Sequence, residues 1–314
     1  MLKPKLILDF DRTLVDTFTR SPRGISVEVA YDFAVGKLFG ENGTKIYYDQ
    51  LEGLQNREPL ELVTEIIDYA RRGGAEIGFD GTIPEAAERL VQLKLECYKP
   101  EISPEWPRLF DGVADFFRGT ADGTIPANVA IVSSGHDAFI RETFGVNNLI
   151  PPDNIVTSDA IRHLSQPQRP LYKPHPYQLA RAHHYWTKDE DGFSSEPGGF
   201  TGRSKDKPLM MFIGDDHVKD GGLAANSRII YGHVPNVQAD FIPCPDKGQL
   251  LIPNFYVLRE LLVKNIDRLQ ETGSLAAVFF DKSDAELFPP LSESERPYMK
   301  WLSENGARPL KERF

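Results

Sequence analysis

The feature that most constrains this chain is a short apolar run near the N-terminus that ends in two carboxylates. Leu6 to Leu8 is followed directly by Asp9-Phe10-Asp11-Arg12-Thr13. Such a run predicts a strand buried on both faces, as in a parallel sheet, and open sheets of that type bind ligands at the carboxyl ends of their strands. Alternation directs Asp9 and Asp11 to the same side. The pair suits a metal-assisted reaction in which one carboxylate attacks and the other handles a proton; the alternative is a polar turn in which Asp11 caps a helix.

Composition and charge restrict the partners that the protein can have. The 314 residues carry a formal net charge of −10, and no basic patch stands out, so we expect no nucleic-acid partner. Cys97 and Cys244 lack the spacing of a zinc site or a disulfide framework. No run is long enough to span a membrane, and the first strand begins almost at once, which leaves no room for a signal peptide. We therefore expect a soluble, cytoplasmic protein; the sequence does not indicate protein partners.

A block of helical patterns interrupts an otherwise alternating α/β chain. Apolar residues recur at helical spacing in three segments, with Pro59 and Pro84 in first turns, and no strand pattern lies between Ser26 and Tyr98. The three segments are Val27 to Phe39, Pro59 to Arg72 and Thr82 to Tyr98. We predict an α/β core over residues 1–25 and 99–272, a helical cap over 26–98, a long polar loop over 187–207 and a C-terminal extension over 273–314.

Further strands and helices are predicted after the cap. Short apolar runs predict strands at 129–132, 154–157, 209–213 and 227–232, and helical patterns cover 136–144, 176–186 and 254–269. In the C-terminal extension, 276–280 reads as a strand and 292–305 as a helix. The fold class predicted from this alternation is α/β.

Polar residues suited to phosphoryl transfer follow three of these strands. The second strand runs into Ser133-Ser134-Gly135, where a hydroxyl and backbone N–H groups can hold phosphate oxygens. The strand at 209–213 ends in Gly214-Asp215-Asp216, with Asp220 one helical turn later. Carboxylates that meet across one gap repel each other unless a cation lies between them, and oxygen-only ligands favour Mg²⁺. Lys173, in a turn before a helix, offers an ammonium that neutralises the nucleophile and the transferring phosphoryl group.

The order of these elements resembles the haloacid dehalogenase (HAD) superfamily, in its phosphohydrolase branch. The resemblance rests on Asp9 to Thr13, the strand that ends at Ser133, Lys173-Pro174 and Gly214 to Asp220, and it extends from Leu2 to Leu262. It implies a Rossmann-like doubly wound, mostly parallel sheet, with a cap inserted after the first motif. The interval between Lys173 and Asp215 is longer than in typical relatives because of the loop at 187–207, and the tail after Gly273 has no counterpart.

The resemblance also implies roles for single residues. Asp9 is expected to be the nucleophile that forms an aspartyl-phosphate, and Asp11 the general acid and base. The Asp9 and Asp215 carboxylates and the Asp11 carbonyl are expected to bind Mg²⁺, while Asp216 and Asp220 hold metal-bound water or serve as further ligands. Ser133 is expected to bind phosphoryl oxygens, with Ser134 as the alternative hydroxyl, and Lys173 to balance charge. The N–H groups of Phe10, Ser134 and Gly135 are expected to assist.

These roles predict a magnesium-dependent phosphatase that acts on a small phosphorylated metabolite, with the cap closing over the site. The carboxylate at Asp11 is retained by phosphatases and by sugar phosphomutases, so a mutase is the alternative within the superfamily; burst kinetics with a bisphosphate activator separates the two. A non-catalytic binding protein that retains the fold is the third possibility, and it predicts no phosphate release from any phosphomonoester. The sequence does not name the substrate.

Overall fold

The computed structural model of the chain describes residues 2–17, 27–50, 59–99, 106–162, 164, 171–187, 209–236, 242–244 and 248–289. Two compact units make up the chain, one formed by Met1–Asp16 with Leu109–Phe314 and the other by Thr17–Arg108. The predicted cap, residues 26–98, falls within the second unit. No helix of the described ranges is both long and apolar enough to cross a membrane.

The first unit is built on a seven-stranded sheet with β1 (Lys5–Leu8) at its centre. On one side of β1 lie β4 (Asn128–Ser133) and β5 (Ile155–Thr157); on the other lie β6 (Met210–Gly214), β7 (Ile230–His233), β9 (Gln249–Leu251) and β8 (Ile242–Cys244). All neighbouring strands pair in parallel except β8 and β9. The predicted α/β, doubly wound, mostly parallel sheet is confirmed.

The direction of winding reverses at β1, and this places the ends of three strands beside one another. Leu8 pairs in register with Ile131 of β4 and with Ile213 of β6. The chain therefore leaves β1, β4 and β6 at the same edge of the sheet, at the topological switch point where open α/β sheets bind ligands. The residues that follow these strands are the polar ones for which the sequence predicts phosphoryl-transfer chemistry.

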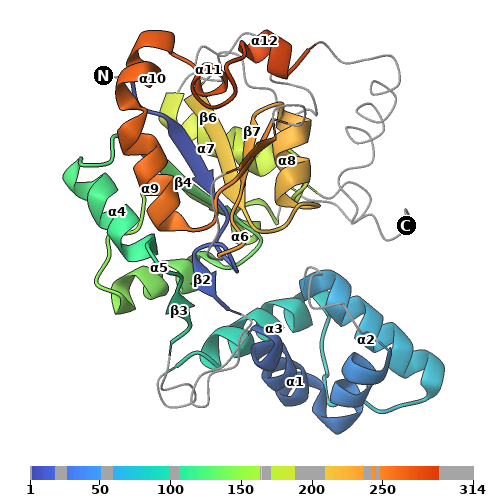
Figure 1. The fold of residues 1–314 in the computed structure, drawn as a ribbon. Helices are drawn as coiled ribbons and strands as arrows, with labels where there is room; N and C mark the ends of the chain where they lie inside the picture. The colour runs from blue at the N-terminus through green and yellow to red at the C-terminus, as the bar shows by residue number, and fades with distance from the viewer. Residues whose placement is uncertain are drawn as a thin grey trace. The chain divides into compact units, whose positions relative to one another are not determined.

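Helices cover both faces of this sheet (Figure 1). On one face, α6 (Ser158–Ile161), α7 (Tyr177–Thr187) and α8 (Asp220–Ser227) pack on the alternate strand residues Ile7, Ala130 and Phe212. On the other lie α4 (Val113–Asp122), α5 (Asp137–Val146) and α9 (Phe255–Lys264), joined by edge-on ring pairs. These pairs are Phe116–Phe255, with ring centroids 5.4 Å apart, and Phe117–Phe144, at 4.7 Å. A strand buried on both faces has no room for polar side chains until it ends, so Asp9 comes where β1 leaves the core.

The second unit is helical, with α1 (Val27–Gln50), α2 (Pro59–Gly73) and α3 (Ile83–Glu96). Gly40 interrupts α1 with φ = 69°, a left-handed conformation that glycine adopts without strain. The start of α3 is fixed by a capping box, in which the Thr82 hydroxyl and the Glu85 carboxylate accept from each other's backbone N–H. Leu62, Ile66 and Leu90 belong to one buried cluster shared by the three helices. Together these helices form a core of their own.

The structure departs from the predictions mainly after Gly232. The amphipathic segment predicted as one helix breaks at Asn265 into α9 and α10 (Ile266–Thr272), and short strands β8 and β9 were not predicted. The predicted strand at 276–280 is wrong: α11 (Leu275–Phe280) is a helix, because the Ser274 hydroxyl accepts from the Ala277 N–H and starts a helical turn. A short helix, α12 (Asp284–Leu287), follows, again started by a capping box at Ser283.

Two further short strands, β2 (Val15–Asp16) and β3 (Arg108–Leu109), were also missed; they form a separate two-stranded sheet. The loop predicted over 187–207 lies outside the described residues except for Thr187, which ends α7. The helix predicted at 292–305 lies outside them too, as does the part of the C-terminal extension beyond residue 289.

Candidate active site

Asp9 is the first residue after β1, and the sheet holds its backbone in place. Its N–H donates to the carbonyl of Ile213 at 2.8 Å, which extends the ladder with β6 by one hydrogen bond. The residue is 6% exposed. Its Oδ1 accepts from the Lys173 Nζ at 2.5 Å, and its Oδ2 lies 3.4 Å from the Thr13 hydroxyl. Asp9 is thus a buried carboxylate with a charged partner on one oxygen and a hydroxyl near the other.

Lys173 reaches this site from the turn before α7. Its Nζ donates to Asp9 Oδ1 at 2.5 Å and to Asp220 Oδ1 at 2.6 Å, with the side chain 3% exposed. Burial alone lowers the pKa of a lysine, but the charges of Asp220 and Asp9 outweigh burial here and raise the pKa of Lys173. The turn is anchored by α8, because the Asn226 side chain donates to the carbonyl of Pro174 at 2.9 Å. Lys173 is therefore a fixed ammonium between two carboxylates.

Three carboxylates converge at this point. Each of Asp9, Asp215 and Asp220 offers one oxygen, and these oxygens lie within 4.8 Å of one another. Burial, and next the charge of Asp9, raise the pKa of Asp215 to about 6; Arg12, whose Nε lies 3.3 Å from Asp215 Oδ2, acts in the opposite direction. A divalent cation removes such repulsion, and an oxygen-only donor set is the one that Mg²⁺ prefers. The residues present therefore fit the predicted magnesium site.

The side chains of Asp9 and Asp215 are 9% and 13% exposed, whereas that of Asp220 is only 1% exposed, and protein groups contact both of its oxygens. Oδ1 accepts from Lys173 and Oδ2 accepts from the Asp216 N–H at 3.2 Å. Burial raises its pKa, while the charge of Lys173 opposes that rise. Gly214 permits this approach, since a Cβ there would lie 2.1 Å from Asp220 Oδ2. We conclude that Asp220 holds Lys173, which leaves Asp9 and Asp215 as the carboxylates best able to face a cation.

The carboxylates of Asp216 and Asp11 have other surroundings than this cluster of carboxylate oxygens, and Asp11 was predicted to offer the metal only its backbone carbonyl. Asp216 Oδ1 accepts from the N–H groups of Val218 at 2.8 Å and Lys219 at 3.0 Å, so it organises the turn that leads into α8. Asp11 lies instead beside the turn after β4: its Oδ2 would be 3.0 Å from a Cβ at Gly135. Of the four carboxylates predicted around the metal, that of Asp216 thus has different surroundings.

In the predicted phosphate-binding turn, a backbone contact holds the Ser133 hydroxyl in place. The Ser133 Oγ accepts from the Gly135 N–H at 2.9 Å, and it would lie 3.2 Å from a Cβ at Gly135, on the side where Asp11 lies. Gln178 of α7 donates to the Ser133 carbonyl at 3.1 Å and fixes the strand end. Ser134 is exposed. The fold thus brings Asp11, Ser133 and Gly135 together, with Ser133 rather than Ser134 turned inward.

Phe10 separates the two carboxylates of the first motif. Its side chain is fully buried and packs edge-on against Phe139, with ring centroids 5.8 Å apart. Only its backbone is therefore suited to the predicted role of contacting a ligand. The alternation inferred from the sequence explains why this ring points into the core between two polar neighbours.

Several contacts of the site were not predicted. The Thr13 hydroxyl lies 3.4 Å from Asp9 Oδ2 and 3.3 Å from Asp215 Oδ1, so it lies between the two carboxylates. The Asn236 side chain donates to the Arg12 carbonyl at 2.9 Å and steadies the turn in which Arg12 has φ = 62°. Thr13 could have been found from the sequence, because its hydroxyl comes two residues after the second carboxylate of the first motif. The residues around Asn236 give no comparable indication. Arg12 itself pairs with Asp215.

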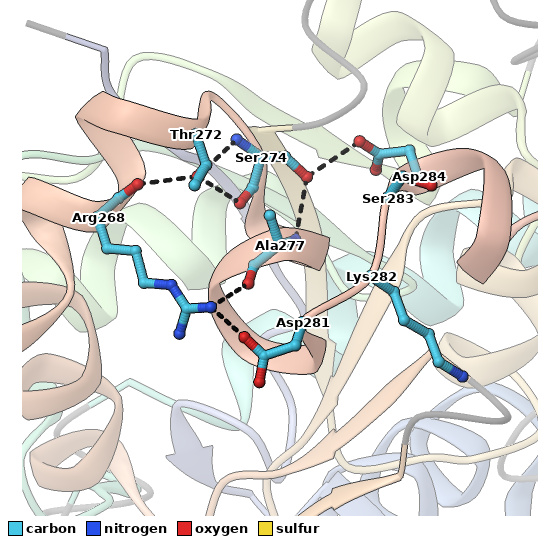
Figure 2. A pocket seen from close by; sticks show the side chains of 8 residues that line it. All are labelled: Arg268, Thr272, Ser274, Ala277, Asp281, Lys282, Ser283 and Asp284. Carbon is cyan, nitrogen blue, oxygen red and sulfur yellow. Dashed lines mark hydrogen bonds and ion pairs between the residues drawn. The ribbon is translucent and has the colours of Figure 1, made fainter.

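A cavity of about 450 Å³ lies away from these residues, among α10, α11 and α12. Figure 2 shows that Arg268, Asp281 and Asp284 are engaged with their neighbours: Arg268 donates to the Ala277 carbonyl and to Asp281, and Asp284 accepts from the Ser274 hydroxyl. None of the predicted site residues lines it. The polar residues at the strand ends, and not this cavity, therefore form the candidate active site.

Comparisons with known proteins give similarity at the level of solved structures only. No family model matches the sequence, and no curated protein does. A HAD hydrolase of family IA, variant 3, from Entamoeba histolytica is 15% identical with a TM-score of 0.46, over 75% of this chain and 86% of that one. A hydrolase from Pseudomonas syringae is 17% identical with a TM-score of 0.45, over 86% of this chain and 99% of that one. CbbY from Rhodobacter sphaeroides, in complex with phosphate, is 14% identical with a TM-score of 0.43, over 74% and 87%.

These neighbours include hydrolases of the superfamily that the motifs resemble. At such identities and TM-scores the likeness carries no argument about activity or substrate.

Proposed function

We propose that this protein is a magnesium-dependent phosphohydrolase that acts on a small phosphorylated metabolite through an aspartyl-phosphate at Asp9. The observation that carries the proposal is the buried Asp9 carboxylate, whose Oδ1 lies 2.5 Å from the Lys173 ammonium while the Asp215 carboxylate lies beside its other oxygen. A buried carboxylate that an ammonium holds in position is suited to act as a nucleophile, and its neighbours are suited to a phosphoryl group. The order of the motifs, which resembles the HAD superfamily, supports the same proposal.

The first half of the reaction is a transfer of the phosphoryl group to the enzyme. An oxygen of Asp9 attacks phosphorus, and the bond between phosphorus and the ester oxygen breaks. The departing alkoxide takes a proton from Asp11, which must be protonated at that moment. Lys173 stays charged throughout and offsets the negative charge that gathers near Asp9, since its pKa is raised. The Ser133 hydroxyl and the N–H groups of the following turn bind phosphoryl oxygens.

The second half returns the enzyme to its starting state. Asp11, now a carboxylate, accepts a proton from water as that water attacks the phosphorus of the aspartyl-phosphate. The bond between phosphorus and the Asp9 oxygen breaks, and inorganic phosphate leaves. The carboxylates of Asp9 and Asp215 and the carbonyl of Asp11 would hold a Mg²⁺ ion, which would supply positive charge to the phosphoryl oxygens. Asp220 takes no part in bond making; it holds Lys173 in place through the 2.6 Å contact.

The helical unit is the part of the chain to which we assign the choice of substrate. The strand-end residues recognise a phosphate ester without recognising its alcohol, because their polar groups are used on phosphoryl oxygens, the cation, the transferred protons or one another. Residues that distinguish one alcohol from another must therefore come from elsewhere in the chain. We expect exchanges in the helical unit to change substrate preference while the dependence on Mg²⁺ is retained.

A phosphatase screen tests the proposal directly. Purified protein is incubated with a panel of phosphorylated metabolites, with and without Mg²⁺, and released phosphate is measured. We expect turnover that needs Mg²⁺, that EDTA abolishes, and that Asp9→Asn reduces by at least three orders of magnitude. The matched control is Asp153→Asn, at an exposed position before β5, which we expect to leave turnover unchanged. Full activity in Asp9→Asn would refute the covalent mechanism, and no phosphate release from any ester would favour a non-catalytic role.

A further inference from the structure

Arg12 brings a positive charge to one of the carboxylates that we assign to the cation. Its Nε lies 3.3 Å from Asp215 Oδ2; the Arg12 side chain is 62% exposed, whereas that of Asp215 is 13% exposed. By contrast, the equally exposed Arg118 of α4 pairs at 3.5 Å with Asp115, whose side chain is 47% exposed. The Arg12 pair thus joins a solvated guanidinium to a largely buried carboxylate of the candidate active site.

The backbone of Arg12 is strained, and its own contacts hold it in that conformation. Its φ of 62° lies in the left-handed region, which costs free energy for any residue except glycine. Its N–H donates to the Val15 carbonyl at 2.8 Å, and its carbonyl accepts from the Asn236 side chain at 2.9 Å. Glycine would make both contacts without strain, because they involve only backbone atoms of residue 12. Strain of this kind persists at functional sites where the side chain has a role.

Arg12 offsets the negative charge that gathers at Asp215. Burial, and next the charge of Asp9, raise the pKa of Asp215, and the charge of Arg12 comes first among those that oppose this rise. Lys173, the second opposing charge, makes its hydrogen bonds to Asp9 and Asp220. A divalent cation at Asp215 would meet the guanidinium beside the same carboxylate, and like charges at such short range repel each other. Arg12 and the cation therefore compete for Asp215.

We propose that Arg12 is the counter-ion that Mg²⁺ displaces from Asp215, and that this exchange sets the affinity of the site for the cation. The inference rests on the proposed function in one respect, which is that Mg²⁺ binds at Asp215. A guanidinium as exposed as that of Arg12 is readily hydrated when it leaves its partner. The exchange neutralises Asp215 in the metal-free protein, and it weakens the binding of Mg²⁺ by the free energy needed to break the ion pair.

Binding of Mg²⁺ to the full-length protein is measured by isothermal titration calorimetry, without substrate. The natural protein is compared with Arg12→Gln, which removes the charge and keeps a side chain at the strained position, and with Arg12→Lys, which keeps the charge. Arg118→Gln is the matched control, because it removes an equally exposed arginine from another ion pair. We expect Arg12→Gln to lower the Kd for Mg²⁺ by about five- to tenfold, Arg12→Lys to change it by about twofold at most, and Arg118→Gln to leave it unchanged.

Two further measurements show whether the charge, rather than the shape of the turn, is responsible. The difference in Kd between the natural protein and Arg12→Gln should shrink as KCl is added, because salt screens an exposed charge. In EDTA, Arg12→Gln should lower the thermal unfolding midpoint of the natural protein and have little effect in the Asp215→Asn background, since the pair is then already broken. A loss of the same size in both backgrounds would contradict the proposed pairing.

The outcomes distinguish a failure of this inference from a failure of the proposed function. An equal Kd for Mg²⁺ in the natural protein and in Arg12→Gln overturns the inference and leaves the phosphohydrolase proposal in place. If Mg²⁺ binds to none of the variants, the inference and the proposed dependence on Mg²⁺ are both wrong. Tighter binding of Mg²⁺ by Arg12→Gln, together with no phosphate release from any ester, supports the exchange at Asp215 and refutes the phosphohydrolase proposal.

Discussion

The carboxylate of Asp215 should destabilise the protein when no cation is bound, and this can be measured. Its side chain is 13% exposed and lies beside Asp9, and burial with that neighbouring charge raises its pKa from 3.8 to about 6. The difference corresponds to a cost of about 3 kcal/mol for keeping the group charged in the folded protein. A residue to which we assign a metal-binding role should thus lower the stability of the metal-free state.

The cost depends on pH in a defined direction. Because the folded-state pKa lies above the ordinary value, the folded protein binds the proton more tightly than the unfolded chain. The cost is therefore close to zero near pH 3, where both states are protonated, reaches about half its full value near pH 5, and is complete above about pH 7. Removal of this charge should stabilise the protein most at high pH.

Asp215→Asn removes the charge and keeps the size of the side chain. We expect the substitution to raise the free energy of unfolding by about 2 kcal/mol at pH 8 in EDTA, since the amide must still be desolvated, and by about half as much at pH 5. Urea unfolding followed by circular dichroism at both pH values measures the change. Asp153→Asn, at an exposed site, is the control and should change stability by less than about 0.5 kcal/mol.

Magnesium gives the same experiment a second readout. Mg²⁺ should stabilise the natural protein at pH 8 and have little effect on Asp215→Asn, which lacks a metal-binding carboxylate. The reasoning is refuted if Asp215→Asn is less stable than the natural protein at pH 8 in EDTA, or if its gain in stability is the same at both pH values. A stability gain that accompanies loss of activity would identify Asp215 as a functional residue rather than a structural one.

Two further substitutions test the contacts around the nucleophile. Lys173→Met leaves the buried Asp9 and Asp220 without the ammonium that pairs with them, and it should lower the free energy of unfolding in urea by about 3–5 kcal/mol. Part of this loss should be recovered in the double variant Lys173→Met/Asp220→Asn. Equal stability of Lys173→Met and the natural protein would show that the three charges are not coupled. Gly135→Ala places a Cβ 3.0 Å from Asp11 Oδ2, so the Asp11 carboxylate must shift. We expect kcat to fall by at least tenfold, with little change in the free energy of unfolding measured in urea. An unchanged kcat would argue against the proton transfers assigned to Asp11.

The central part of the fold and the main residues of the site are predictable from sequence because they depend on local pattern. A continuous apolar run can be buried on both faces only in a sheet covered by helices, and its polar residues must then come at its end. For this reason the pattern of residues alone predicts that Asp9, Ser133 and Asp215 lie at one sheet edge. The structure adds the distances and the registers, such as Leu8 opposite Ile131.

Contacts between distant residues were beyond the reach of sequence reasoning. Asp220 was predicted near the metal from the resemblance of its motif to the HAD superfamily, whereas its contact with Lys173 joins residues 47 positions apart and needs the close approach that Gly214 permits. The Asn236 contact with Arg12 spans 224 positions. The error at Leu275 to Phe280 has another cause: a six-residue apolar run suits a strand or a helix equally, and the Ser274 cap decided the outcome.

The most direct test of the account is the detection of the covalent intermediate on Asp9. Protein mixed with a substrate found in the screen and with Mg²⁺ is quenched in acid within milliseconds, digested and examined by mass spectrometry for an added phosphoryl group. We predict phosphorylation of the peptide that contains Asp9, with the group on that carboxylate, appearing before free phosphate and absent in Asp9→Asn. Steady turnover without any phosphorylated Asp9, or with the group on another residue, would contradict the account.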